Sequence, residues 1–138
     1  MTVSGIVKCS LVDFPGVLSC VLFLPGCNYD CYYCHNRGLL GNNPESLPQS
    51  EIFDFLKKRK GHLDGVAVTG GEPTLYPDLI PFLQEIKALG FKLKLDTNGS
   101  RPEIVKELLS LSLCDYFAVD YKSPTERYRE LCGENVDP

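Results

Sequence analysis

The sequence predicts an α/β fold, a parallel-sheet partial (βα) barrel of about four βα units. Short apolar runs typical of strands alternate with longer amphipathic patterns typical of helices, in the order strand, helix, strand, helix, strand, helix, strand. Such alternation favours parallel strands joined by right-handed crossovers. The chain has 138 residues, whereas a closed eight-unit barrel takes about 250. We therefore expect one domain, residues 1–138, that forms the N-terminal part of a longer partial barrel.

The first strand and helix follow from burial and capping patterns. Residues 17–24 are apolar and carry no charge, as expected of a strand buried on both faces. A loop without periodicity covers residues 38–45. A capping box at residues 46–49, with proline in the first turn, predicts a helix that ends near Gly61. The apolar face of this helix is made of Ile52, Phe53 and Leu56.

The remaining elements repeat this unit of a strand followed by a helix. Residues 65–69 form a short apolar strand, and residues 77–89 form a helix that Gly90 terminates. Apolar residues and lysines alternate over 91–95, which indicates a third strand. A second capping box, at residues 100–103, predicts a helix with the apolar face Ile104, Val105, Leu108 and Leu111. A fourth strand at 116–119 and a short helix from Pro124 complete the pattern.

Composition excludes several classes of partner. Fourteen basic and eighteen acidic residues give a net charge of −4, and the largest basic cluster, 57–60, lies in the last turn of a predicted helix. We therefore expect no nucleic-acid partner. The apolar run 17–24 is far shorter than the roughly 20 residues that span a bilayer, so we expect no membrane contact. Seven cysteines without a signal peptide indicate a reducing compartment, the cytoplasm.

A cysteine loop directly follows the first strand. Cys27, Cys31 and Cys34 have C-x3-C-x2-C spacing. Thiolates hold iron–sulfur clusters, and three ligands to a four-iron cluster leave one iron open for chemistry. Zinc would favour a second C-x2-C or a histidine pair, and an odd number of cysteines disfavours a disulfide framework. We expect the other cysteines to act as small buried hydrophobes: Cys9, Cys20, Cys114 and Cys132.

Every predicted strand ends in a chemically distinctive motif. After the cysteine loop these motifs are residues 70–72, 96–99 and 120–122. The carboxyl ends of parallel strands meet at one rim, where α/β proteins bind ligands. Gly70 and Gly71 allow close backbone approach to a ligand, Glu72 could hold an ammonium group, and Lys122 could hold a carboxylate. Asn98 and Asp120 could bond hydroxyls. A ligand with these groups beside an open iron matches S-adenosylmethionine.

The motifs together resemble the radical S-adenosylmethionine superfamily. The resemblance depends on the cysteine spacing, on Tyr33 directly before the third cysteine, and on residues 70–73 after a strand. It implies a partial (βα)6 barrel in which Cys27, Cys31 and Cys34 hold a [4Fe–4S] cluster whose fourth iron chelates the amino and carboxylate groups of S-adenosylmethionine. It also implies that residues 70–72 contact the amino group. The backbone of Tyr33, Cys34 and His35 would lie against the adenine.

Residues 10–16, 34–36, 96–99 and 120–122 are similar to the glycyl-radical-enzyme activases, above all those of anaerobic ribonucleoside-triphosphate reductase. This resemblance implies reductive cleavage of S-adenosylmethionine to a 5′-deoxyadenosyl radical, which generates a glycyl radical on the partner enzyme. It implies a flavodoxin- or ferredoxin-type electron donor, contacts from Asp120 and Lys122 to the cosubstrate, and a monovalent cation at Asp96, Thr97 and Asp120.

This chemistry requires no side-chain acid or base, so we assign none, and we expect His35 to have a structural role. Two alternatives stay open. One is a radical enzyme that acts on a small molecule, as 7-carboxy-7-deazaguanine synthase does. The other is a non-catalytic iron–sulfur or zinc module.

Overall fold

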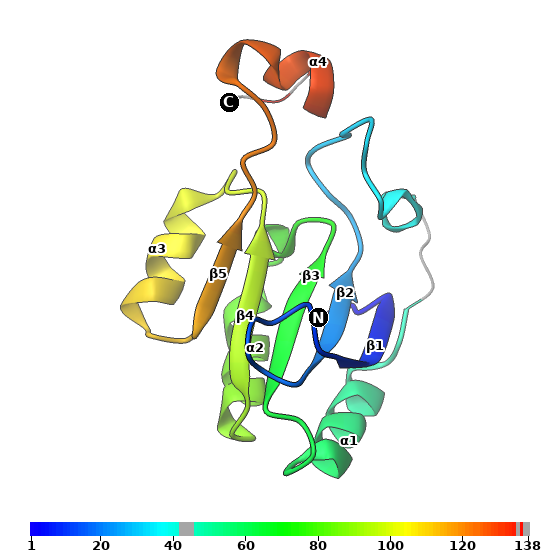
Figure 1. Cartoon of the computed structure of the whole chain (residues 1–138), viewed down its shortest axis with the longest axis vertical. Helices are drawn as coiled ribbons and strands as arrows, with labels where there is room; N and C mark the ends of the chain where they lie inside the picture. Colours follow the sequence, from blue (N-terminus) through cyan, green and yellow to red (C-terminus); the bar gives the residue numbers. More distant parts are fainter. Residues whose placement is uncertain (42–45, 135, 137–138) are drawn as a thin grey trace.

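The computed structural model describes residues 1–41, 46–134 and 136. They form a five-stranded sheet in the order β1-β2-β3-β4-β5 (Figure 1). The strands are β1 (Gly5–Ser10), β2 (Ser19–Leu24), β3 (Gly65–Gly70), β4 (Lys92–Thr97) and β5 (Tyr116–Val119). Strands β2 to β5 are parallel, and β1 is antiparallel to β2. The predicted α/β fold with a parallel sheet is therefore confirmed.

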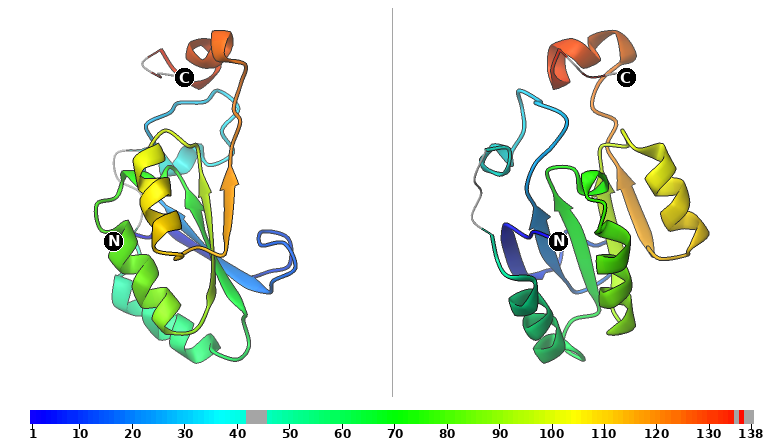
Figure 2. Two further views of the ribbon diagram at one scale, coloured as in Figure 1. Left: turned by 90° about the vertical axis from the view of Figure 1, so that its left-hand side faces the viewer. Right: turned by 180° about the vertical axis from the view of Figure 1, so that it is seen from behind.

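Three helices cover one face of the sheet (Figure 2). They are α1 (Gln49–Arg59), α2 (Leu79–Ala88) and α3 (Pro102–Ser110). Their apolar residues pack on alternate residues of the parallel strands to form the main core, which includes Leu22, Leu24, Leu56, Val66, Val68, Leu83, Leu93 and Leu95. The predicted buried residues of α1, Ile52, Phe53 and Leu56, are confirmed. Because the strands are parallel, their carboxyl ends and the loops that follow lie at one edge.

Short helical segments lie at that edge. They are the 3-10 turns η1 (Arg37–Leu39), η2 (Pro73–Leu75) and η3 (Thr125–Arg127), and the helix α4 (Tyr128–Cys132). In Figure 1, η3 and α4 stand beyond the end of β5 and next to the loop that follows β2. Part of the predicted loop 38–45, residues 42–45, lies outside the described residues. No helix in the described part of the chain is long and apolar enough to span a bilayer.

Strand β1 was not predicted. Only Ile6 and Val7 in Gly5–Ser10 are aliphatic, and the segment is partly exposed at the edge of the sheet. It forms a strand because it pairs with β2 through the register Gly5↔Phe23, a contact that its own hydrophobic pattern does not indicate. The first parallel strand also begins two residues later than residue 17, where the apolar run starts.

Both predicted capping boxes are wrong. Helix α1 begins after Pro48, and α3 begins after Arg101, with no side-chain cap hydrogen bond in either case. The Ser100 hydroxyl instead accepts a hydrogen bond from Asn28 Nδ2 at 2.9 Å, across 72 residues of sequence. Leu111 follows α3 as its C-cap and is 47% exposed, so it is not part of the buried helix face.

The cysteines outside the loop differ from one another. Cys20 is buried and Cys114 is half-buried, and burial raises the pKa of each thiol to about 12, as expected of small core residues. Cys9 is exposed on β1, which contradicts the prediction of a buried residue. Cys132 is fully buried, but it packs against the cysteine loop and not in the main core.

Candidate functional site

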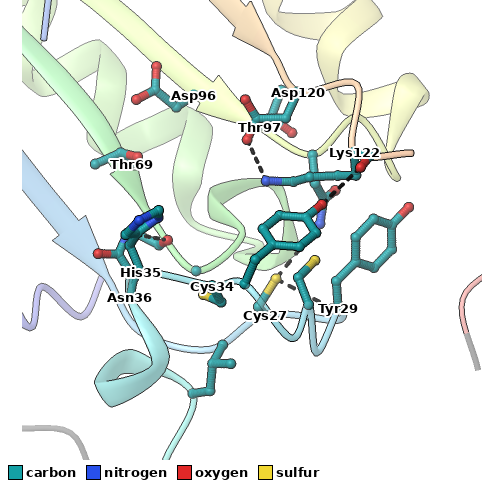
Figure 3. Close-up of a pocket in the computed structure, with 16 residues that line it drawn as sticks. Cys27, Tyr29, Cys34, His35, Asn36, Thr69, Asp96, Thr97, Asp120 and Lys122 are labelled. Atoms are coloured by element: carbon teal, nitrogen blue, oxygen red, sulfur yellow. Dashed lines mark hydrogen bonds and ion pairs between the residues drawn. The ribbon is translucent and has the colours of Figure 1, made fainter. Parts of the chain in front are cut away.

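A cavity of about 230 Å³ lies at the carboxyl ends of the strands (Figure 3). Its lining includes nearly all the residues that the sequence predicts for the site: Cys27, Cys31, Tyr33, Cys34, His35, Gly70, Gly71, Asp96, Thr97, Asn98, Asp120 and Lys122. Glu72 is missing from this lining. Four further residues that were not predicted for the site also line the cavity: Tyr29, Asn36, Leu40 and Thr69. Each of the four lies within five residues of a predicted one, which is the only signal that the sequence offers for them.

Arg37 organises the cysteine loop from its carboxyl side. Its guanidinium donates to the Cys31 carbonyl at 2.8 Å and to the Asp30 carboxylate at 2.7 Å. The Cys34 amide donates to the Cys31 carbonyl at 3.0 Å and closes a tight turn between these two cysteines. These hydrogen bonds hold the backbone of the loop between Asp30 and Arg37.

Helix α4 packs on the same loop. The Asp30 amide donates to the Cys132 carbonyl at 2.8 Å, and the Tyr32 amide donates to the Leu131 carbonyl at 3.2 Å. The apolar cluster between the two segments contains Tyr29, Cys31, Cys132 and Val136, with Cys27, Cys34, Tyr128 and Leu131 at its margin. Burial, and after it the neighbouring Cys132 thiol, raise the pKa of the Cys31 thiol to about 11.

Gly71 brings the end of β3 against the start of the cysteine loop. Its amide donates to the Leu24 carbonyl, and the Glu72 amide donates to the Gly26 carbonyl, each at 2.8 Å. A Cβ on Gly71 would lie 1.7 Å from the Gly26 carbonyl oxygen. These glycines were expected to allow the close approach of a ligand, and Gly71 also allows the close approach of one backbone segment to another.

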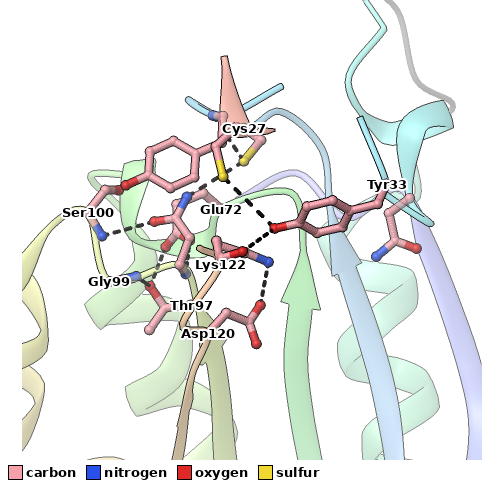
Figure 4. A network of polar contacts seen from close by, with 12 residues as sticks. Cys27, Tyr33, Glu72, Thr97, Gly99, Ser100, Asp120 and Lys122 are labelled. Atoms are coloured by element: carbon pink, nitrogen blue, oxygen red, sulfur yellow. Dashed lines mark hydrogen bonds and ion pairs between the residues drawn. The ribbon is translucent and has the colours of Figure 1, made fainter. Parts of the chain in front are cut away.

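The Glu72 carboxylate does not face the cavity. It is fully buried, and Oε1 accepts bonds from the Thr74 amide, the Thr74 hydroxyl and the Thr97 hydroxyl. Oε2 accepts the Asn98 amide at 2.6 Å. Protein donors therefore occupy the oxygens that were expected to hold a ligand ammonium group. Glu72 instead links the turn after β3 to the turn after β4 (Figure 4).

Asn98 extends this link to the cysteine loop. Its Nδ2 lies 3.0 Å from Asn28 Oδ1 and 3.8 Å from Cys27 Sγ. Its Oδ1 accepts the Ser100 amide at 2.9 Å. The side chain is 9% exposed and lines the cavity. Burial raises the pKa of the Cys27 thiol, although bonds from the Tyr29 amide and from Asn98 act in the opposite direction.

Lys122 and Asp120 form an ion pair at the cavity, with 2.6 Å between Nζ and Oδ2 (Figure 4). Burial lowers the pKa of Lys122, but the hydrogen bond and charge of Asp120 more than offset it, so the pKa is raised and the ammonium group stays charged. The Tyr33 hydroxyl donates to the Lys122 carbonyl at 2.9 Å. A ligand carboxylate that binds Lys122 would share this ammonium group with Asp120.

The three residues predicted to hold a monovalent cation already have partners. Lys94 Nζ forms an ion pair with Asp96 Oδ1, although that oxygen accepts no hydrogen bond from the part of the chain that the structure describes. Lys122 Nζ pairs with Asp120, and the Thr97 hydroxyl donates to Glu72. The two carboxylates that line the cavity therefore each have a lysine as counter-ion. The contacts of Asp96, Thr97 and Asp120 therefore give no support to the predicted binding of a monovalent cation.

The donor set fits a cluster with several irons better than a single metal ion. Cys27, Cys31 and Cys34 are free thiols that line one cavity. Within residues 1–41, 46–134 and 136, no three His, Cys, Asp or Glu side chains gather as ligands of one ion. A cluster takes one thiolate per iron, so its ligands need not converge on a point. The zinc alternative gains no support from this geometry.

The chain is similar in sequence to a known protein family and to several curated proteins. The Radical SAM superfamily profile matches residues 21–138. A protein of Methanocaldococcus jannaschii named "Putative glycyl-radical enzyme activating enzyme" is 42% identical over 96% of this chain and 56% of its own length. A protein of Thermococcus kodakarensis named "Probable GTP 3',8-cyclase" is 32% identical over 78% of this chain and 36% of its own length. The chain thus spans about half or less of these relatives.

Two solved structures have the same fold. QueE from Escherichia coli superposes with a TM-score of 0.58 at 18% identity, over 72% of this chain and 53% of that chain. TYW1 with a lysine–pyruvate adduct superposes with a TM-score of 0.54 at 18% identity, over 86% of this chain and 46% of that chain. At this identity the likeness concerns the fold alone, a partial barrel. With a profile match over residues 21–138 and a cysteine-lined cavity at the strand ends, the chain belongs to the radical SAM superfamily.

Proposed function

We propose that this chain is the cluster-binding and cosubstrate-binding part of a glycyl-radical-enzyme activating enzyme. The observation that carries the proposal is that three thiols share one cavity with the Gly70–Gly71 turn and the Asp120–Lys122 ion pair. The name of the Methanocaldococcus jannaschii relative supports the activase role. Residues 1–138 are the core domain in this proposal, and anaerobic ribonucleoside-triphosphate reductase is the partner.

Within the cavity, Cys27, Cys31 and Cys34 would each bind one iron of a [4Fe–4S] cluster and leave the fourth iron for S-adenosylmethionine. The charged Lys122 ammonium group would attract the carboxylate of the methionine moiety. The backbone of Gly70 and Gly71 would receive its amino group, because the Glu72 carboxylate is occupied by other donors.

Other lining residues would orient the nucleoside. The backbone of Tyr33, Cys34 and His35 would lie against the adenine, and Tyr33 is fixed by its bond to the Lys122 carbonyl. Asp120 would keep Lys122 in place and could accept a ribose hydroxyl, as could Asn98. These residues bind and orient the cosubstrate, and none of them acts as an acid or base.

When bound, the reduced cluster would supply the one electron that is needed to cleave S-adenosylmethionine to methionine and a 5′-deoxyadenosyl radical. In this proposal a glycine of the partner would give up a hydrogen atom to that radical, which would leave 5′-deoxyadenosine and a glycyl radical. The electron would come from a flavodoxin- or ferredoxin-type donor. Seven free cysteines support a reducing compartment, and we place the protein in the cytoplasm.

The test begins with anaerobic reconstitution of the chain with iron and sulfide, followed by dithionite and S-adenosylmethionine. We expect about four irons per chain, and 5′-deoxyadenosine as a product. The variants C27A, C31A and C34A should each lose most of the iron and the product. C9A, a change at an exposed cysteine on β1, should keep both. Iron retained in C34A, or absent from the wild type, would contradict the ligand assignment.

The partner is tested separately. Adding anaerobic ribonucleoside-triphosphate reductase to the reduced mixture should produce a glycyl radical signal in electron paramagnetic resonance. Formation of 5′-deoxyadenosine without that signal would disprove this partner and would favour the small-molecule alternative. That alternative remains a prediction, and the likeness to QueE concerns its fold only.

A further inference from the structure

We propose that Asn98 tunes the reduction potential of the cluster by donating an N–H···S hydrogen bond to Cys27. This inference rests on the proposed function, because it requires that Cys27 bind an iron. It gives Asn98 a role toward the cluster in addition to any contact with the cosubstrate.

The orientation of the Asn98 amide follows from its neighbours. The Ser100 backbone N–H can only donate, so the Asn98 atom 2.9 Å from it must be the oxygen. The amino group therefore points the other way, toward Cys27 Sγ at 3.8 Å and Asn28 Oδ1 at 3.0 Å. A flipped amide would place two donors against each other at Ser100. The sulfur thus receives a donor and not an acceptor.

Glu72 fixes the backbone from which this amide extends. Its Oε2 accepts the Asn98 N–H at 2.6 Å, and its Oε1 accepts the Thr97 hydroxyl at 2.7 Å. Both Glu72 and Asn98 are buried. The side chain of Asn98 therefore has little freedom to turn away from Cys27.

Such a donor has a defined electronic effect. Hydrogen bonds to the sulfurs of an iron–sulfur cluster are among the factors that set its reduction potential. An N–H dipole directed at a thiolate stabilises the more negative, reduced state, so it raises the potential. The Tyr29 amide also donates to Cys27 Sγ, at 3.4 Å, but side-chain substitution cannot remove a backbone donor. Asn98 is the donor that mutation can test.

The experiment compares wild-type protein with N98A, N98D and S100A after reconstitution, by iron and sulfide content and by a redox titration followed by electron paramagnetic resonance. N98A should shift the midpoint potential to a more negative value, by more than the spread of replicate titrations. N98D should shift it further, because the carboxylate still accepts the Ser100 amide but places negative charge beside the sulfur. S100A should match the wild type, because it removes only the hydroxyl that Asn28 contacts.

The outcomes separate this inference from the proposed function. If the wild type takes up no cluster, the proposed function fails and the inference fails with it. If the wild type is loaded but N98A keeps its potential, only the inference fails. The inference would also be overturned if S100A shifted the midpoint potential as much as N98A does, or if both Asn98 variants lost their iron. Either result would mean that Asn98 only stabilises the fold of the cysteine loop.

Discussion

Gly71 offers the sharpest test of how the site is assembled. In Gly71→Ala, the new Cβ would lie 1.7 Å from the Gly26 carbonyl oxygen and 2.4 Å from its carbon. Real Cβ contacts keep at least 3.0 Å, so the start of the cysteine loop would have to move by about 1.3 Å. Both neighbours are backbone atoms, which cannot rotate away as a side chain can. The substitution therefore pushes the cysteine loop away from β3.

The cost follows from the contacts that this movement strains. The Glu72 amide would lose its bond to the Gly26 carbonyl, and the Gly71 bond to Leu24 would be distorted. With about 1 kcal/mol for each net hydrogen bond and about 1–3 kcal/mol for overpacking, we expect the free energy of unfolding to fall by about 2–4 kcal/mol. For a domain of this size, that lowers the melting temperature by roughly 10 °C.

The assay is urea unfolding of the cluster-free chain followed by circular dichroism, with Gly38→Ala as the matched control. A Cβ on Gly38 would meet nothing within 4 Å, so that variant should be as stable as the wild type. Iron uptake of Gly71→Ala should fall as well, because the cysteine loop is displaced. The reasoning would be refuted if Gly71→Ala and Gly38→Ala had the same unfolding midpoint.

Two further predictions concern the scaffold. Burial raises the pKa of Asp115, but the hydrogen bonds from Lys87 and from the Leu93 amide, together with the nearby lysine charges, outweigh it and lower the pKa below its ordinary value of 3.8. The stabilisation is therefore present above that value and is lost as the pH falls through the lowered pKa. Asp115→Asn should lower the free energy of unfolding at pH 7 by at most about 1 kcal/mol, since the side chains of Lys87 and Asp115 are both about one-third exposed. Urea unfolding at a series of pH values should show that the difference between wild type and variant shrinks below pH 3.8. A difference that stayed constant with pH would contradict a stabilising role for the Lys87–Asp115 ion pair. Leu108 is fully buried on the inner face of α3, so Leu108→Ala should lower the free energy of unfolding by about 2–5 kcal/mol, measured by thermal unfolding. Leu109 is 56% exposed, so Leu109→Ala should change this free energy little. Similar losses of stability in the two variants would mean that the face of α3 that packs on the sheet is assigned incorrectly.

The sequence was sufficient to predict the parallel part of the sheet. Strands buried on both faces leave uninterrupted apolar runs, as at Ser19–Leu24 and Gly65–Gly70, and these runs alternate with helical patterns. Because parallel topology brings the carboxyl ends together, the motifs after these strands could be assigned to one rim. The cavity lining agrees with that assignment.

What could not be predicted depends on contacts between distant segments. Glu72 was expected to face the ligand, and only the fold shows that Thr97 and Asn98 supply its donors. Ser100 fits a capping box by local pattern, yet its hydroxyl bonds to Asn28 across 72 residues. In both cases a local motif offers one partner, and the tertiary structure supplies a different one.

The contact between α4 and the cysteine loop has a consequence for the order of biosynthesis. The amides of Asp30 and Tyr32 bond to the carbonyls of Cys132 and Leu131, about a hundred residues later in the chain. While the ribosome is still making the strands in between, these amides lack their partners, and the loop cannot take its final shape. We therefore expect metal insertion to follow translation of residue 132, so that a nascent chain stalled before that point would acquire iron poorly.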